Sequence, residues 1–373
     1  MLASLLRIIL LTATLKILER GLDKGPIIDN KMEPLISIII PFYNDRDYLG
    51  ECIKSILNQT FEAWQAIFVD DASNDGGPAI IEKIARKDCR VLLIRNKVNC
   101  GVAQSREIGL SYVESPYIMF LDGDDMLTMD ALSALWQGIK NVDVCIGQHY
   151  ILKGENAIKT KSRTIPGLYS DLMLNEIKEK MIYSAQGYSG MSVNGVVWQA
   201  LFKKNLIYDN LHYTDPNLWF SEDHLLFTAA MMDARTLRII NDYVYYYRKH
   251  DRNVTVCYRP YYFENAVRLY RDFSYLLKDK RSSEMMRKTN DWFFLKNVEH
   301  SIKREVMQSG KNYASCKLEL EKMRHHPLVE YLLTDDNLSV IDHSGRKYLK
   351  LLQRGWLRWI YINLKWKTFK EKI

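Results

Sequence analysis

The sequence predicts an α/β protein whose mostly parallel sheet carries helices on both faces and is followed by a C-terminal helical extension. Strand and helix patterns alternate four times in under ninety residues from Leu35 onward, which is typical of a parallel sheet. The run 36–40 is apolar except for Ser37, largely β-branched, and ends at Pro41. Such a run is expected of a strand buried on both faces.

Each expected element follows from a local pattern of this kind. Apolar residues at helical spacing predict helices between the strands. Pro78 stands in the first turn of one of these helices, where its missing N–H costs nothing. Two later strands extend the sheet, and the chain then becomes helical from Tyr261 to about Leu333. The expected strands are 36–40, 66–69, 91–94, 117–121, 193–202 and 237–247, and the first helices are 49–57, 78–84 and 102–113.

Composition and charge narrow the class of protein. The 373 residues are 47% hydrophobic and 26% charged, as in a packed globular chain. The net charge of +7 is concentrated in residues 343–373, which carry nine Lys or Arg and one acid. A nucleic-acid-binding domain would place its basic face on the folded core, so we expect no nucleic-acid partner. The six Cys are scattered without a CxxC pair, which suits a reducing compartment.

The N-terminal segment is not predicted to cross a membrane. Its apolar stretch 5–18 is interrupted by Arg7 and Lys16, whereas a spanning helix needs about 20 apolar residues. We expect residues 1–31 to form an amphipathic segment outside the main fold. The remaining chain is divided at 258 and 342, giving a main α/β domain 32–258, a helical extension 259–342 and a basic aromatic tail 343–373.

Acidic residues follow three of the expected strands. Tyr43-Asn44-Asp45, Asp70-Asp71 and Asp122-Gly-Asp-Asp125 each stand at a strand end. In parallel sheets, ligands bind beyond the carboxyl ends of the strands. The sequence therefore predicts a site for a cation and a phosphorylated ligand on this rim.

Asp122 and Asp124 are the expected cation ligands. They lie two residues apart at a strand end, and Gly123 between them allows a tight turn. All-oxygen ligation suits Mn²⁺ or Mg²⁺ rather than Zn²⁺. The alternative is a turn whose Asp caps the next helix, but three Asp in four residues repel one another without a cation.

Taken in order, the motifs resemble the family 2 glycosyltransferases of the GT-A fold, the group that builds bacterial surface polysaccharides. The resemblance covers roughly residues 35–253. In the segment 99–109, Glu107 stands where the family usually has Asn. The matching segments are SIIIPFYN (37–44), FVDDASND (68–75), NCGVAQSREIG (99–109), YIMFLDGDD (117–125), SEDHLLF (221–227) and YYYRKHDRNVT (245–255).

This resemblance implies an inverting, metal-dependent hexosyl- or N-acetylhexosaminyl-transferase. Its donor would be a nucleotide-diphosphate sugar, with UDP expected, and its acceptor a hydroxyl of a growing capsule, O-antigen or lipooligosaccharide glycan, free or lipid-linked. It would act at the cytoplasmic face of the cell membrane. Residues 32–130 would form the nucleotide-sugar half and residues 131–258 the acceptor half.

The resemblance also assigns roles to single residues. Asp223 is the expected general base, which takes the acceptor's proton, with Glu222 as the alternative; both acids also suit a first helical turn. For the other positions, packing, a surface salt bridge or a solvated loop stays open beside the functional role. The expected donor-binding residues are Pro41, Tyr43, Asp71, Arg106, Asp122, Asp124 and Asp125, with Arg248 and His250 near the diphosphate and Trp198 near the acceptor.

Two other interpretations are considered. A haloacid-dehalogenase-like phosphatase would use Asp122 as nucleophile and Asp124 as acid and base, but that family places the motif after its first strand. A non-catalytic, membrane-peripheral protein of the same fold would not need intact acids at 122, 124, 222 and 223.

The composition of the tail predicts that it contacts an anionic membrane surface. Three of the eight Trp lie at 356, 359 and 366, among nine Lys and Arg. Leu349, Leu352, Trp356 and Trp359 are expected to share one helical face, and Gly355 leaves room for two short helices. The alternative is a helix docked on the body, with the Trp as packing.

Overall fold

The computed structural model describes residues 33–160, 163–251 and 257–370. The predicted amphipathic segment 1–31 lies outside these residues. Ten strands form one sheet in the described part, in the order β3-β2-β1-β4-β9-β6-β10-β5, with β7 on β6 and β8 on β10. Six of them, β3, β2, β1, β4, β6 and β10, run in one direction, because β9 pairs antiparallel with both β4 and β6. The predicted fold class is confirmed.

The bounds of the strands follow the predicted order closely in the first half of the chain. They are β1 Ile36–Phe42, β2 Trp64–Asp70, β3 Val91–Arg95, β4 Tyr117–Phe120, β5 Met126–Leu127, β6 Val144–Lys153, β7 Asn156–Lys159, β8 Gly167–Ser170, β9 Ala200–Lys203 and β10 Thr236–Arg248.

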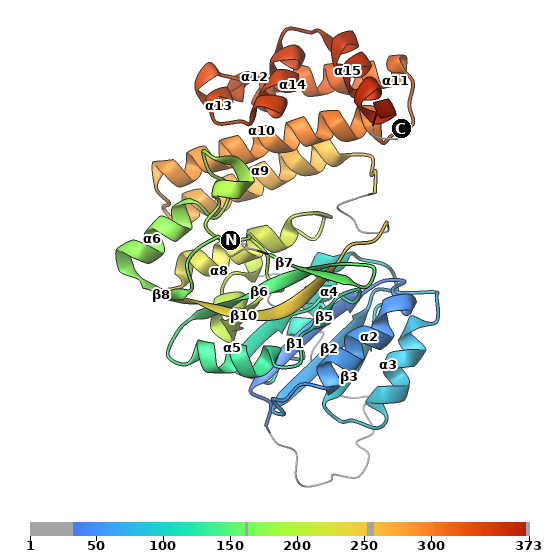
Figure 1. The fold of residues 1–373 in the computed structure, drawn as a ribbon, viewed down its shortest axis with the longest axis vertical. Helices are drawn as coiled ribbons and strands as arrows, with labels where there is room; N and C mark the ends of the chain where they lie inside the picture. The colour runs from blue at the N-terminus through green and yellow to red at the C-terminus, as the bar shows by residue number, and fades with distance from the viewer. Residues whose placement is uncertain (1–32, 161–162, 252–256, 371–373) are drawn as a thin grey trace, which may run out of the picture.

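The helices lie on both faces of this sheet and beyond its end (Figure 1). They are α2 Arg46–Leu57, α3 Gly77–Ala85, α4 Val102–Leu110, α5 Ala131–Ile139, α6 Asp171–Glu179, α7 Lys204–Tyr208, α8 Glu222–Asp233, α9 Tyr262–Asp279, α10 Glu284–Met307, α11 Tyr313–Arg324, α12 Pro327–Leu332, α13 Asp335–Ser339, α14 His343–Gln353 and α15 Leu357–Lys370.

The apolar side chains of β1 belong to two separate cores, one on each face of the sheet. This is why the apolar run along the strand is almost continuous. Ile38 and Ile40 face the core shared with α2, α3 and α5. Ile39 faces the opposite core, which continues through α8 and into α9, α10 and the C-terminal helices. Alternate side chains of a strand point to opposite faces, so a strand covered on both sides needs apolar residues throughout.

The prediction of a strand over 193–202 is wrong in extent, since β9 covers only Ala200–Lys203. Val193 and Val197 are buried in the core, yet their segment packs without joining the sheet. At Gly195 the chain lies so close to α8 that a Cβ would stand 2.1 Å from Cδ2 of His224. Apolar residues here serve this packing rather than a strand.

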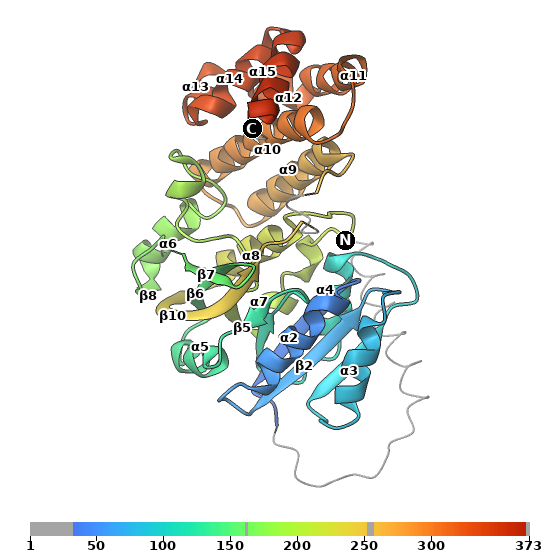
Figure 2. The same ribbon diagram turned by 45° about the vertical axis from the view of Figure 1, so that its right-hand side comes forward.

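The C-terminal helices form a layer separated from the sheet by α9 and α10 (Figures 1 and 2). Gly355, with φ of 71°, ends α14 before α15 begins, so the tail holds two short helices. The expected shared face is wrong: Leu349 and Leu352 are buried, whereas Trp356 and Trp359 are exposed. No helix of the described residues is both long enough and apolar enough to cross a membrane.

Candidate active site

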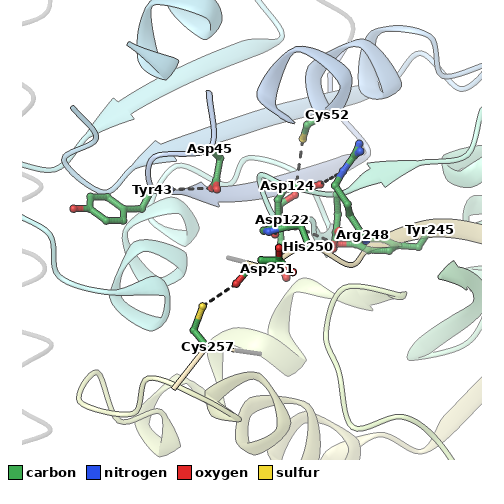
Figure 3. Close-up of polar contacts among 11 residues, drawn as sticks. Tyr43, Asp45, Cys52, Asp122, Asp124, Tyr245, Arg248, His250, Asp251 and Cys257 are labelled. Atoms are coloured by element: carbon green, nitrogen blue, oxygen red, sulfur yellow. Dashed lines mark hydrogen bonds and ion pairs between the residues drawn. The ribbon is translucent and has the colours of Figure 1, made fainter. Parts of the chain in front are cut away.

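The carboxyl ends of β1, β2 and β4 bring the predicted polar clusters together on one rim, as the close-up in Figure 3 shows for several of them. Asp122, Asp124 and Asp125 follow β4 in a tight turn. Gly123 is required there, because an added Cβ would lie 2.6 Å from Cβ of Phe42 and 3.3 Å from the Pro41 carbonyl oxygen. Pro41 itself is buried in β1 and forms the wall behind this turn.

His250 and Arg248, which follow or end β10, reach over the acidic turn (Figure 3). The Nε2 atom of His250 lies 2.8 Å from Oδ2 of Asp124, and its ring stacks on Tyr48. Arg248 donates from Nε to the Asp124 carbonyl oxygen at 2.9 Å and forms an ion pair with Glu51. Arg248 therefore fixes the acidic turn by its bond to the Asp124 carbonyl oxygen and is itself held by Glu51.

Asp125 has a structural task in the same turn. It accepts hydrogen bonds from the Tyr245 hydroxyl and from the backbone N–H of Arg248, both at 2.7 Å. The backbone N–H of Asp122 in turn donates to the Tyr245 hydroxyl at 3.2 Å. Burial, with the charges of Asp124 and Asp122, raises the pKa of Asp125 well above its usual range. These contacts fix the turn against β10.

Arg106 connects the acidic turn with α8. Its guanidinium lies 2.8 Å from Oδ1 of Asp122 and 2.6 Å from Oε1 of Glu222. Although burial opposes the charged form, the carboxylates of Asp122, Glu222 and Asp223 raise the pKa of Arg106. The alternative of a helix-surface salt bridge is wrong in its location, because Arg106 is buried and makes both of these ion pairs inside the protein.

Asp223 is the second residue of α8, which begins directly after Ser221; the φ of 59° at Ser221 turns the chain sharply into the helix. One of its oxygens accepts the backbone N–H of His224 at 2.8 Å. Burial and the neighbouring charge of Glu222 raise the pKa of Asp223 to about 8, against the opposing effect of Arg106. A raised pKa is what a carboxylate needs to take up a proton from a hydroxyl.

Asp71 is held by the loop that precedes α4. It accepts hydrogen bonds from the backbone N–H groups of Cys100 and Gly101, at 2.9 and 2.8 Å, and from Asn96 at 2.9 Å. Burial by itself would raise the pKa of Asp71, but the hydrogen bonds outweigh this effect and lower the pKa below its usual value. Gly101, with φ of 89°, allows the loop to turn into α4.

Tyr43 and Trp198 lie in very different surroundings. Tyr43, just beyond β1, exposes 46% of its surface, so its side chain is not core packing. Trp198 is 8% exposed, with its ring stacked on Tyr247 and close to Tyr245 and His149. Its position favours the packing alternative over contact with an acceptor sugar.

Asp45 is placed on the rim by its position in the sequence but has no predicted role of its own. Burial, followed by the charges of Asp124, Asp122 and Asp75, raises its pKa to about 7. Its Oδ2 accepts the Tyr43 backbone N–H at 3.1 Å, and Gly123 packs beside it. Its place directly after the first strand was the available signal.

The donor set fits a hard divalent cation. Asp122 and Asp124 offer carboxylate oxygens, and burial together with the charge of Asp124 raises the pKa of Asp122 despite Arg106. A cation would relieve this excess of negative charge. Among the described residues, no three His, Cys, Asp or Glu side chains form a metal site by themselves. Oxygens of a bound diphosphate would have to complete the coordination.

Comparison with known proteins identifies the family that the first half of the chain matches. Residues 37–196 match the sequence model of Glycosyl transferase family 2. The putative glycosyltransferase EpsH of Bacillus subtilis is 26% identical over 288 residues, which cover 76% of this chain and 81% of EpsH. The cholesterol galactosyltransferase of Borreliella burgdorferi is 30% identical over 214 residues, covering 56% of this chain and 59% of that protein.

Solved structures show the same fold. Residues 1–349 of TarS from S. aureus superpose with a TM-score of 0.60 and 17% identity, covering 91% of this chain and 92% of that one. Residues 37–196 therefore form a glycosyl transferase family 2 domain, and the curated relatives of this chain are bacterial glycosyltransferases. The phosphatase alternative is not favoured.

Proposed function

We propose that this protein is an inverting, metal-dependent glycosyltransferase that moves a sugar from a nucleotide-diphosphate donor to a hydroxyl of a growing bacterial surface glycan. The observation that carries this proposal is the position of Arg106 between Asp122 and Glu222. One guanidinium thereby holds the acidic turn and the start of α8 together. Donor diphosphate and acceptor hydroxyl need that proximity to react.

On the donor side, Asp122 and Asp124 would hold Mn²⁺ or Mg²⁺. A bound cation would neutralise the charge that develops on the departing nucleotide diphosphate. His250, at hydrogen-bond distance from Asp124, orients this carboxylate. Tyr43 offers an exposed ring for the nucleotide base, beside Pro41 and the loop that Asp71 fixes.

The donor is proposed to be a UDP-sugar, with a hexosyl or N-acetylhexosaminyl group. TarS, which shares the fold, has been solved with UDP and with UDP-GlcNAc. The proposed acceptor is a capsule, O-antigen or lipooligosaccharide chain, free or lipid-linked. A poly(ribitol-phosphate) β-glucosyltransferase among the relatives supports an acceptor of the bacterial surface.

Asp223 is the better candidate for the general base than Glu222. Glu222 is already bound to Arg106 at 2.6 Å, so its charge is committed to the ion pair. Asp223 has a pKa raised to about 8 by burial and by Glu222. A base works best when its pKa lies near the working pH, so Asp223 can accept the hydroxyl proton as the sugar is transferred.

Nucleotide binding tests this function without knowledge of the acceptor. Thermal unfolding is followed with UDP, GDP or CDP, each with Mn²⁺ or with EDTA. We expect UDP with Mn²⁺ to raise the melting temperature, because a ligand that binds only the folded state stabilises it. A screen of UDP-sugars by UDP release, with bacterial membrane glycans as acceptor, then identifies the sugar. Absence of any metal-dependent nucleotide binding would refute the proposal.

A further inference from the structure

Helix α15 carries two apolar stripes on opposite sides. Leu357, Ile360 and Leu364 are fully or almost fully buried, and they belong to the core in which α15 packs against α10 and α11. These three side chains suffice to dock the helix on the body. The docked-helix alternative from the sequence is thus correct for this stripe, but it leaves the aromatic residues unexplained.

The second stripe faces away from the protein. Its members recur at spacings of three, four and three residues, so they share one side of the helix. Trp359, Ile362, Trp366 and Phe369 expose 60%, 50%, 59% and 56% of their surfaces, and Trp356, just before the helix, exposes 52%. A surface helix of a globular protein normally has only one apolar stripe, so this exposed stripe indicates an interaction surface.

Positive charge surrounds this stripe. Residues 343–370 contain eight Lys or Arg and no Asp or Glu. By helical spacing, Arg358 and Lys365 flank the stripe on one side and Lys370 on the other. A hollow of about 280 Å³ at the start of α15 is lined by Trp356, Trp359, Arg358 and, from α11, Lys317. Glu321 also lines it, but that acid lies near Arg324 and His325.

We propose that this face of α15 docks on an anionic lipid bilayer, with the aromatic stripe in the headgroup layer and the flanking Lys and Arg beside lipid phosphates. Trp and Phe among Lys and Arg are the composition of helices that lie in a membrane interface. Anionic lipids complement the net positive charge of the segment. The buried stripe keeps α15 attached to the enzyme while the outer stripe contacts the lipid.

The test uses the full-length protein and vesicles of phosphatidylcholine alone or mixed with phosphatidylglycerol, at low and high salt. Two tail variants remove the aromatic stripe (Trp359→Ser with Trp366→Ser) or the charge (Arg358→Gln with Lys370→Gln). Two control variants make matched changes on remote helices: exposed Leu172 and Met173 of α6 to Ser, and exposed Lys83 and Lys87, in and after α3, to Gln. Far-UV circular dichroism checks that all of them fold.

We expect the wild type to sediment with anionic vesicles at low salt and hardly at all with neutral ones. Loss of two cations should weaken partitioning by roughly 10- to 30-fold, since each contributes on the order of 1 kcal/mol near the surface. The aromatic variant should lose at least about tenfold, and the tryptophan fluorescence of the wild type should shift to the blue on binding. Both control variants should bind like the wild type.

Other outcomes would overturn the proposal. Tail variants that bind anionic vesicles as well as the wild type would show that the membrane surface lies elsewhere. A wild-type protein indifferent to lipid charge would exclude electrostatic docking. A dimer that Trp359→Ser with Trp366→Ser converts to a monomer, without any effect on vesicle binding, would make the stripe an interface between two copies. None of these readouts depends on catalysis, so the proposed function is tested separately.

Discussion

His250 and Asp124 are 126 residues apart in the sequence, yet Nε2 of the imidazole lies 2.8 Å from Oδ2 of the carboxylate. The contact joins the residues that follow β10 to the turn that follows β4. It restrains Asp124, one of the two carboxylates proposed to hold the cation. Arg106 restrains the other, Asp122, through an ion pair of 2.8 Å. Both proposed ligands are thus oriented before any donor binds.

The Asp122→Asn and Asp124→Asn variants should lose turnover and metal dependence. Each change removes a charged oxygen ligand while keeping the shape of the side chain. UDP release measured over a Mn²⁺ titration checks this prediction. Asp130→Asn, at an exposed position nearby, is the matched control and should retain activity. Near-normal activity of either variant in the presence of EDTA would contradict the metal assignment.

The Asp223→Asn variant should bind UDP and Mn²⁺ normally but turn over at least about a hundredfold more slowly. Because the pKa of Asp223 is raised to about 8 and a base acts in its deprotonated form, the wild-type kcat/KM should rise with pH and level off above about 8. The variant's residual rate should lack this rise. Calorimetry measures the binding of UDP and Mn²⁺, and a pH profile measures the role of the base. Loss of nucleotide binding would instead show that Asp223 belongs to the donor pocket.

The Arg106→Gln variant should be strongly destabilised. Removing the guanidinium leaves Glu222 and Asp122 without their buried partner, which costs about 3–5 kcal/mol of the free energy of unfolding. Urea denaturation measures this. Arg86→Gln, which breaks an exposed ion pair with Glu82, should cost about 1 kcal/mol or less.

A second readout separates a positioning role of Arg106 from stability alone. Arg106 lowers the pKa of Asp223, so its loss should shift the rise of the pH profile to higher pH in whatever folded enzyme remains. An unchanged profile would show that Arg106 does not act on the base.

The Gly123→Ala variant should weaken nucleotide binding and lower the stability by about 1–3 kcal/mol. Its new Cβ would lie 2.6 Å from Cβ of Phe42 and 3.2 Å from Oδ2 of Asp45, so the acidic turn must move. Gly50→Ala in α2 meets no atom within 4 Å and should stabilise the helix by about 0.5–1 kcal/mol. Equal effects at both positions in thermal unfolding would contradict the close-packing argument.

The first four strands and the acidic turn could be predicted because their signals are local. The run 36–40 predicts a strand buried on both faces, which the structure extends to Phe42, and Asp122 and Asp124 follow a strand of the same kind. Strand ends in a parallel sheet meet on one rim, so the general place of the site follows from the order of elements alone.

Long-range pairing could not be predicted in the same way. The sequence left Arg106 between a donor contact and a surface salt bridge, because nothing near it indicates Glu222, which lies 116 residues later. The apolar residues of segment 193–199 pack into the two cores on either side of the sheet, and periodicity alone does not distinguish such packing from a strand. In α15, apolar residues occur on both sides, so only the fold shows which side is docked.

The link made by Arg106 also limits how this enzyme can be recombined with its relatives. Arg106 lies inside the segment 37–196 that matches the family, whereas Glu222 lies beyond it. A chimera that exchanges residues 37–196 as a module therefore places a foreign helix α4 against the native start of α8. Such an exchange should fold only when the incoming segment supplies a cation at the position of Arg106, so the modular unit for enzyme engineering extends at least through α8.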